Sequence, residues 1–105
     1  MTNTFLIFLY DAEVCMEIKK VTKSWGSENS WTFGKCKNPQ KYANHKTYTM
    51  NCCLAKGEQT LTCKDSYGDG WHGGYLEIQG KKYCEDFTTG RKKTVKIEVK
   101  GIKQI

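Results

Sequence analysis

The chain has 105 residues, of which 38% are hydrophobic, and its net charge is +6 at pH 7. That length suffices for one domain with a thin hydrophobic core, so we expect residues 1–105 to form a single domain. No stretch reaches the eighteen consecutive apolar residues of a transmembrane helix. Lysine supplies all but one of the basic residues, which argues against nucleic acid as a partner, because arginine is the preferred reader of bases and phosphates.

Six cysteines indicate how so thin a core is stabilised. An even number of cysteines in a short chain predicts disulfides, which form in an oxidising compartment, so we expect a secreted protein. Zinc is disfavoured because there are no paired C-x-x-C knuckles and no Cys/His cluster. The cysteines expected to be paired are Cys15, Cys36, Cys52, Cys53, Cys63 and Cys84.

The chain opens with an apolar segment, residues 5–10. The segment is shorter than the hydrophobic region of a signal peptide and no basic segment precedes it, so we expect a strand. Because the cysteines imply secretion, Met1 is expected to begin a mature domain and not a precursor. Residues 14–21 follow with strict alternation, in which Val14, Met16 and Ile18 share one face of a half-buried strand.

Further short apolar or alternating runs complete a predicted β-protein. Strands are expected at residues 30–33, 47–54, 59–64, 75–79, 82–87 and 94–100. Residues 22–29 are predicted to form a polar turn, and residues 35–46, which hold the only proline, an irregular surface excursion. No window of eleven residues shows helical periodicity. Strands that recur every eight to twelve residues predict an all-β fold, an antiparallel sandwich such as a jelly-roll, or a barrel, of about seven to nine strands.

The cysteine positions suggest a pairing. A bridge from Cys36 to Cys52 would close a loop of about seventeen residues and stabilise the fold by about 3 kcal/mol. The adjacent Cys52 and Cys53 point to opposite faces of a strand, which favours different partners. Hairpin geometry would let Cys53 approach Cys63, although parity does not decide it. These two bridges would leave Cys15 to pair with Cys84.

The stretch from residue 64 to residue 75, Lys-Asp-Ser-Tyr-Gly-Asp-Gly-Trp-His-Gly-Gly-Tyr, combines acidic side chains, turn glycines and aromatics. Asp65 and Asp69 are separated and followed by glycines that allow a sharp turn, so both carboxylates can reach one centre. Calcium takes six to eight oxygen ligands from carboxylates, carbonyls and water. The stretch therefore predicts a calcium site.

The stretch has two other interpretations. An EF-hand is excluded, because counting from Asp65 places Tyr67 at ligand position 3 and Leu76 at the position of the bidentate glutamate. The second interpretation is a tight loop between strands, in which the aspartates cap backbone N–H groups and Trp71 and Tyr75 pack in the core.

The run CKDSYGDGWHGGYLEIQGKKYC is similar to a motif, C-x-D-S-Y-G-D-G-W-x-G-x-x-L-x-I, of a family of small secreted disulfide-containing β domains. Upstream, SWGSENSW resembles a second element of that family, in which a glutamate follows an aromatic turn. Together they cover about residues 14 to 87. The resemblance implies an extracellular β-rich module and no particular activity. Similar D-G-W loops occur in CUB-like sandwiches, some of which bind calcium.

Glu28 is expected to lie near the acidic loop, because SWGSENSW is the only other place where a carboxylate, a glycine and tryptophans coincide. It is the third candidate metal ligand, with Asp65 and Asp69. No enzymatic activity is expected, since the chain offers only His45 and His72 as bases and no nucleophile in a catalytic pattern.

Carbohydrate is the sharper candidate ligand, because lectin sites combine a calcium or carboxylate centre with an aromatic ring that packs on a sugar. The candidate ligand-binding residues are Trp25, Tyr67, Trp71, His72 and Tyr75. We therefore expect a secreted calcium-binding recognition or matrix module whose partner is a carbohydrate or another matrix component. The alternatives are a calcium-free structural or adhesive module that binds polyanions through surface lysines, and a basic secreted toxin or inhibitor.

Overall fold

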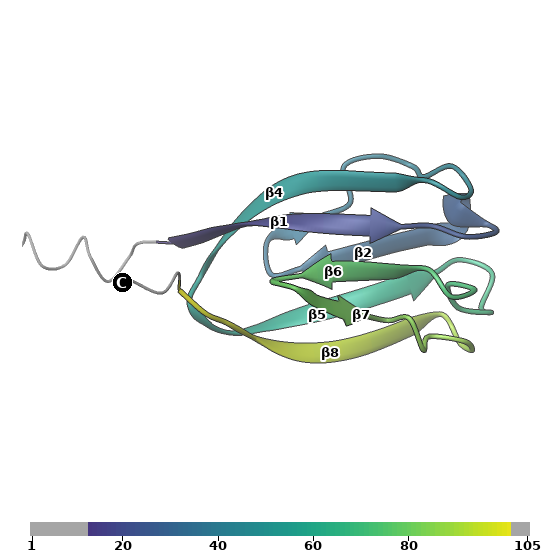
Figure 1. Ribbon diagram of the computed structural model, residues 1–105. Coiled ribbons are helices and arrows are strands. Elements are labelled where there is room, and N and C mark those ends of the chain that lie inside the picture. The colour runs from purple at the N-terminus through teal and green to yellow at the C-terminus, as the bar shows by residue number, and fades with distance from the viewer. Residues whose placement is uncertain (1–12, 102–105) are drawn as a thin grey trace, which may run out of the picture.

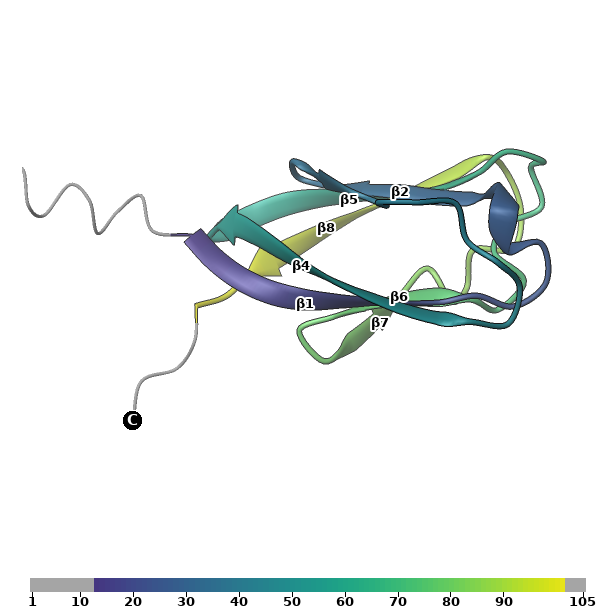
Figure 2. The ribbon, with the colours of Figure 1, turned by 90° about the horizontal axis from the view of Figure 1, so that it is seen from above.

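The computed structural model describes residues 13–101, which form two four-stranded sheets. Sheet A has the strand order β4-β1-β6-β7 and sheet B the order β3-β2-β5-β8, and every neighbouring pair is antiparallel. The elements are β1 Glu13–Val21, the short 3-10 helix η1 Gly26–Glu28, β2 Asn29–Phe33, β3 Cys36–Lys37, β4 Thr47–Ala55, β5 Gly57–Asp65, β6 Tyr75–Ile78, β7 Lys81–Tyr83 and β8 Lys92–Val99. Figure 2 shows the sheets as two layers, so the predicted sandwich of about seven to nine strands is confirmed.

The core lies between the two sheets. Alternation along each strand sends one set of side chains inward, as predicted for Ile18 in β1, which is buried. Trp31 and Phe33 in β2 and Leu76 and Ile78 in β6 are buried in the same way. On β8 the apolar face is buried at Ile97 and Val99. Among the described residues no helix is long and apolar enough to cross a bilayer.

Four connections between the sheets meet at one end of the sandwich (Figure 1). They are residues 22–28, 38–46, 66–74 and 84–91. The strand register explains why connections of sheet A lie at the same end, because Val21 at the end of β1 pairs with both Thr47 and Tyr75, which begin β4 and β6. Glycine-rich and acidic loop sequence is thus gathered at one end, while the start of β1 and the end of β8 lie at the other (Figure 1).

Three disulfides are present, two of which link the layers, and no cysteine is free. The predicted Cys36–Cys52 bridge is confirmed and links the edge strand β3 of sheet B to β4 of sheet A. The predicted Cys53–Cys63 and Cys15–Cys84 pairs are wrong. The observed pairs are Cys15–Cys53, within sheet A, and Cys63–Cys84, which joins β5 to the residue after β7.

The wrong pairing has a simple cause. The chain passes from sheet A to sheet B at Lys56, between β4 and β5, so these strands are not the two arms of a hairpin. Cys63 is buried between the sheets, whereas Cys53 lies on the opposite face of β4 from the buried Cys52. Cys53 instead lies directly opposite Cys15 in the β1–β4 register.

The ends of several strands are shifted by one or two residues from the prediction, and two segments differ from it more strongly. The strand expected at 82–87 ends as β7 at Tyr83, because Cys84 adopts a left-handed conformation (φ 66°) and a turn follows, with Phe87 N–H donating to Cys84 O. The excursion expected at 35–46 contains the two-residue strand β3. The strand expected at residues 5–10 lies outside the described residues.

Candidate metal centre

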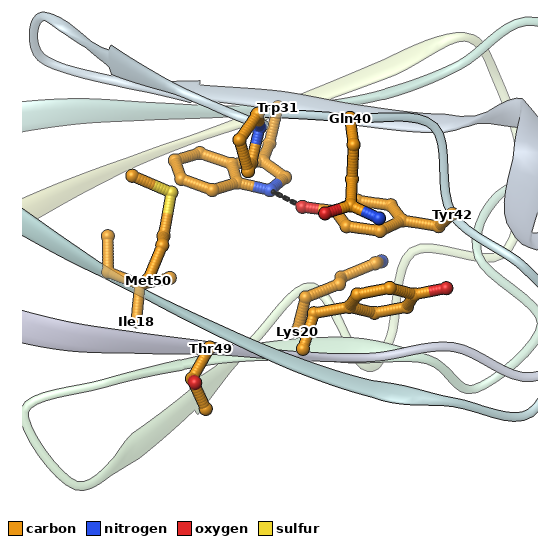
Figure 3. Close-up of a pocket in the computed structure, with 9 residues that line it drawn as sticks. Ile18, Lys20, Trp31, Gln40, Tyr42, Thr49 and Met50 are labelled. Atoms are coloured by element: carbon orange, nitrogen blue, oxygen red, sulfur yellow. Dashed lines mark hydrogen bonds between the residues drawn. The ribbon is translucent and has the colours of Figure 1, made fainter.

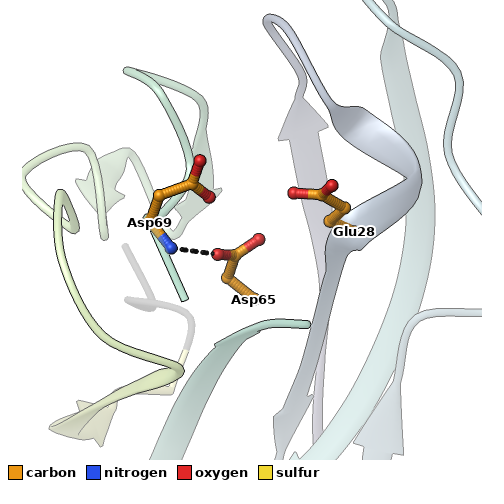
Figure 4. Close-up of side chains that lie close together, drawn as sticks. All are labelled: Glu28, Asp65 and Asp69. Carbon is orange, nitrogen blue, oxygen red and sulfur yellow. Dashed lines mark hydrogen bonds between the residues drawn. The ribbon is translucent and has the colours of Figure 1, made fainter. Parts of the chain in front are cut away.

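Strand pairing brings Glu28 to the acidic loop, as predicted. Asn29 and Asp65 are partners in the β2–β5 register, and Glu28 immediately precedes Asn29 at the end of η1. The Ser66 N–H donates to Glu28 O at 3.1 Å, which extends the contact by one step into the loop. Figure 4 shows the Asp69 carboxylate close to those of Glu28 and Asp65. One oxygen from each of Glu28, Asp65 and Asp69 lies within 4.8 Å of the other two.

One carboxylate oxygen of Asp65 stabilises the acidic loop by accepting backbone hydrogen bonds. Asp65 Oδ2 accepts backbone N–H bonds from Gly68 at 2.7 Å, Asp69 at 2.6 Å and Gly70 at 3.0 Å. Burial would raise the pKa of Asp65, but these hydrogen bonds outweigh it and lower that pKa below its ordinary value. The capping of backbone N–H groups, which was the alternative role for the aspartates of this loop, is therefore a property of Asp65.

The glycines of the loop are required by its shape. Gly68 and Gly70 have φ of 98° and 78°, in the region that favours glycine. A Cβ atom on Gly70 would lie 2.1 Å from Phe87 O, the carbonyl that accepts the Trp71 N–H at 2.9 Å. The acidic loop thus packs backbone to backbone on the 84–91 connection.

The remaining oxygens of the cluster lack donors. Asp65 Oδ1, Glu28 Oε1 and Asp69 Oδ1 are buried acceptors with no hydrogen-bond partner among the described residues. Asp65 is only 2% exposed, and Figure 4 shows its second oxygen turned toward the other two carboxylates. Buried acceptors without a donor cost free energy, and three of them in one place form a cluster that could hold a cation.

The electrostatics of the cluster agree with this interpretation. Burial raises the pKa of the Glu28 carboxyl, and the charges of Asp65 and Asp69 raise it further. The charges of Asp65 and Asp69 therefore oppose the ionisation of Glu28, whereas a bound cation would favour it. His72 lies on the far side of Asp69, with Nε2 3.2 Å from Asp69 Oδ2, and this contact orients the Asp69 carboxylate.

The predicted ligand-binding aromatics separate into three environments. Trp25 and Tyr67 are exposed and line a hollow beside Glu28 and Asp69. Trp71 is fully buried and its Nε1–H donates to Lys64 O at 2.8 Å, so it presents no face to a ligand, in contrast to its expected role. Tyr75 is partly buried in β6, where Lys82 Nζ lies 4.5 Å from its ring centroid, outside the hollow.

A buried lysine behind the site was not predicted. Lys20 is 1% exposed, and its Nζ donates to Asn29 Oδ1 at 2.9 Å. Figure 3 shows it inside the sandwich beside Tyr42, whose hydroxyl accepts the Trp31 Nε1–H at 2.9 Å. The signal was present in the sequence, because the inward face of residues 14, 16 and 18 continues by parity to Lys20.

Comparison with protein-family models, with curated proteins and with solved structures finds no match to this chain. The similarity of the acidic loop to the D-S-Y-G-D-G-W motif therefore stays a resemblance. A functional assignment depends on the geometry of the site.

Proposed function

We propose that the protein is a calcium-binding extracellular recognition module whose metal is held by Glu28, Asp65 and Asp69. The observation that carries the proposal is the convergence of three buried carboxylate oxygens that have no donor among the described residues. Calcium binds oxygen at about 2.3–2.6 Å, so two oxygens on opposite sides of one ion lie about 4.6–5.2 Å apart, and the separations within this cluster, at most 4.8 Å, are compatible with a shared ion. Carboxylates are the hard ligands that calcium prefers.

The disulfides support the extracellular part of the proposal. All six cysteines are paired, and two of the bridges join the two sheets. Such bridges persist in oxidising compartments and are reduced in the cytosol. The same compartments hold about millimolar calcium, which matches the modest affinity of extracellular calcium modules, with Kd on the order of 0.1–1 mM.

Calcium titration of the metal-free protein tests this function. Calorimetry should give a Kd in that range, and 1 mM calcium should stabilise the fold by about 0.4–1.4 kcal/mol, which raises Tm by a few degrees. Magnesium should bind more weakly, because it requires octahedral geometry and dehydrates reluctantly. Glu28→Gln should weaken calcium binding, while Asp86→Asn, at an exposed carboxylate paired with Lys93, is the matched control. A wild-type protein whose Tm and heat signal do not respond to calcium would refute the proposal.

A second candidate function is the binding of polyanions without calcium. On the outer face of sheet B the register places Lys64 opposite Lys92, and Lys96 opposite Thr60. Like charges directly opposite one another destabilise a sheet, so a sulfated chain lying across this face would relieve their repulsion. Retention on heparin in the presence of chelator, lost in Lys64→Gln/Lys92→Gln and kept in Lys19→Gln on sheet A, would favour this function.

A further inference from the structure

The acid cluster forms one wall of an open hollow. The hollow has a volume of about 250 Å³ and is lined by Trp25, Glu28, Tyr67 and Asp69. This volume is below the range of about 300–1,000 Å³ for sites that enclose drug-sized ligands, so it suits the end of a larger molecule. A metal held by the cluster would face this hollow through Glu28 and Asp69.

Two exposed aromatic side chains form the other walls. Trp25 is 57% exposed and Tyr67 is 72% exposed, and they are the large hydrophobic side chains that the described part of the chain leaves in solvent. Both belong to the same hollow, although they come from different connections. Scattered exposed apolar residues need no explanation, but exposed aromatics that flank a polar centre are typical of ligand sites.

The backbone holds the Trp25 side chain in place. Trp25 has φ 61° and ψ 38°, a left-handed conformation that is a strained outlier for a bulky residue. The Glu28 N–H donates to Trp25 O at 3.1 Å, and the Gly26 N–H donates to Asn44 Oδ1 at 2.8 Å. Backbone strain of this kind clusters at ligand sites, so the constrained position of Trp25 at the rim of the hollow supports a ligand contact there.

We propose that this hollow binds the terminal sugar of a neutral glycan, with two adjacent hydroxyl groups on the calcium and one ring face against Trp25 or Tyr67. The proposal rests on the proposed function, because the calcium ion supplies the contact to the hydroxyls. Three carboxylates leave several of the six to eight coordination positions open to ligand oxygens. The flat face of a sugar ring is apolar and packs on an aromatic ring.

Charge decides between neutral and acidic sugars. Three carboxylates outweigh the two positive charges of calcium by one, so the occupied centre stays negative. This net negative charge disfavours a sulfated or carboxylated sugar relative to a diol, which carries no charge. The ligand class is therefore a neutral sugar with a vicinal diol.

The test measures retention of the protein on immobilised mannose, fucose, galactose, glucose and glucuronic acid, in 2 mM calcium and then in chelator. At least one neutral sugar should retain the wild type in calcium only, and glucuronic acid should not. Trp25→Ala should weaken that binding about tenfold while calcium affinity is unchanged. Tyr67→Ala is the second variant, because Tyr67 is highly exposed, and Tyr75→Ala outside the hollow is the matched control.

The possible outcomes distinguish failure of the glycan site from failure of the proposed calcium binding on which it rests. A protein that does not bind calcium refutes the metal site and the glycan site together. A protein that binds calcium but no neutral sugar, or whose sugar binding survives both Trp25→Ala and Tyr67→Ala, refutes the glycan site alone. Calcium-dependent sedimentation with phosphatidylserine vesicles, without sugar binding, would assign the hollow to a membrane surface instead.

Discussion

The Nζ atom of Lys20 lies 3.1 Å from the centroid of the Trp71 ring, in the interior of the sandwich. The same nitrogen donates to Oδ1 of the buried Asn29, which directly follows Glu28 in the chain and pairs with Asp65 in the strand register. Lys20 thus connects β1 to the two segments that carry the acid cluster. From the core side, Lys20 therefore holds Asn29 and Trp71, which lie close to the candidate metal ligands in the chain.

The stability of the fold should depend on the proton of Lys20. Burial lowers the pKa of Lys20 from 10.5 to about 6, and the Trp71 ring face and Asn29 Oδ1 act in the opposite direction by favouring the ammonium form. Between pH 6 and 10.5 the unfolded chain therefore holds a proton that the folded chain lacks. The contribution of Lys20 to the free energy of unfolding therefore rises with pH across that window and is lowest below pH 6.

Lys20→Met removes this dependence. Urea unfolding at pH 7, 8 and 9 should show the free energy of unfolding of the wild type rising relative to the variant by about 1.4 kcal/mol per pH unit. The variant should be favoured most at the lowest pH. A difference that stays constant from pH 7 to 9 would show that the buried amine remains charged, with the Trp71 ring as its main partner.

The two aspartates of the loop should respond differently to the loss of charge. Asp65→Asn weakens three hydrogen bonds to a charged acceptor and should lower calcium-free stability by about 1–3 kcal/mol. Asp69→Asn should leave calcium-free stability nearly unchanged, because no backbone N–H bonds to the Asp69 carboxylate are found among the described residues, and it should abolish the increment from calcium. Thermal unfolding with and without calcium measures both. An equal loss in Asp69→Asn under both conditions would make it a structural turn residue.

The site was predictable to the extent that it depends on local sequence. Asp65 and Asp69 could be found because glycines beside acidic residues mark a turn that gathers carboxylates. Glu28 could be found because its turn resembles the acidic loop in composition. The sequence did not reveal that one oxygen of Asp65 caps the loop while the other faces the cluster, since that division depends on side-chain rotation.

The errors come from contacts between the sheets. Period-2 alternation predicts which face of a strand is buried, but not which sheet the strand joins, and the crossing at Lys56 therefore misled the pairing of Cys53. Trp71 stands in a polar loop, which is why the sequence predicts a ligand-binding role for it. The structure buries it, because the loop folds back over the open end of the core and Phe87 packs 6.0 Å from its ring.

The disulfides should open in the order of their exposure. Cys15 is exposed and Cys53 is partly buried, whereas Cys63 and Cys84 are 0% and 3% exposed. Limited reduction followed by alkylation and peptide mapping should therefore label Cys15 and Cys53 first. Replacing both by alanine should cost about 4 kcal/mol, since the bridge spans 38 residues. Recovery of a linked Cys53–Cys63 peptide from native protein would contradict the fold.

A comparison of alanine substitutions at two glycines separates the cost of a steric clash in the acidic loop from the cost of the left-handed backbone. Gly70 and Gly80 have nearly the same φ, 78° and 81°, but a Cβ atom on Gly70 would meet Phe87 O at 2.1 Å, whereas one on Gly80 would meet nothing within 4 Å. Gly80→Ala should cost about 1–2 kcal/mol from the left-handed conformation alone.

Gly70→Ala should cost about 2–5 kcal/mol, because the clash with backbone is added to the same strain. The displaced loop should also carry Asp69 away from Glu28 and weaken calcium binding, while Gly80→Ala leaves calcium affinity unchanged. Urea unfolding and calcium calorimetry measure the two effects separately. Equal losses of stability in the two variants would mean that the acidic loop does not rest on the 84–91 connection, and the carboxylates would then lack the support that holds them within 4.8 Å of one another.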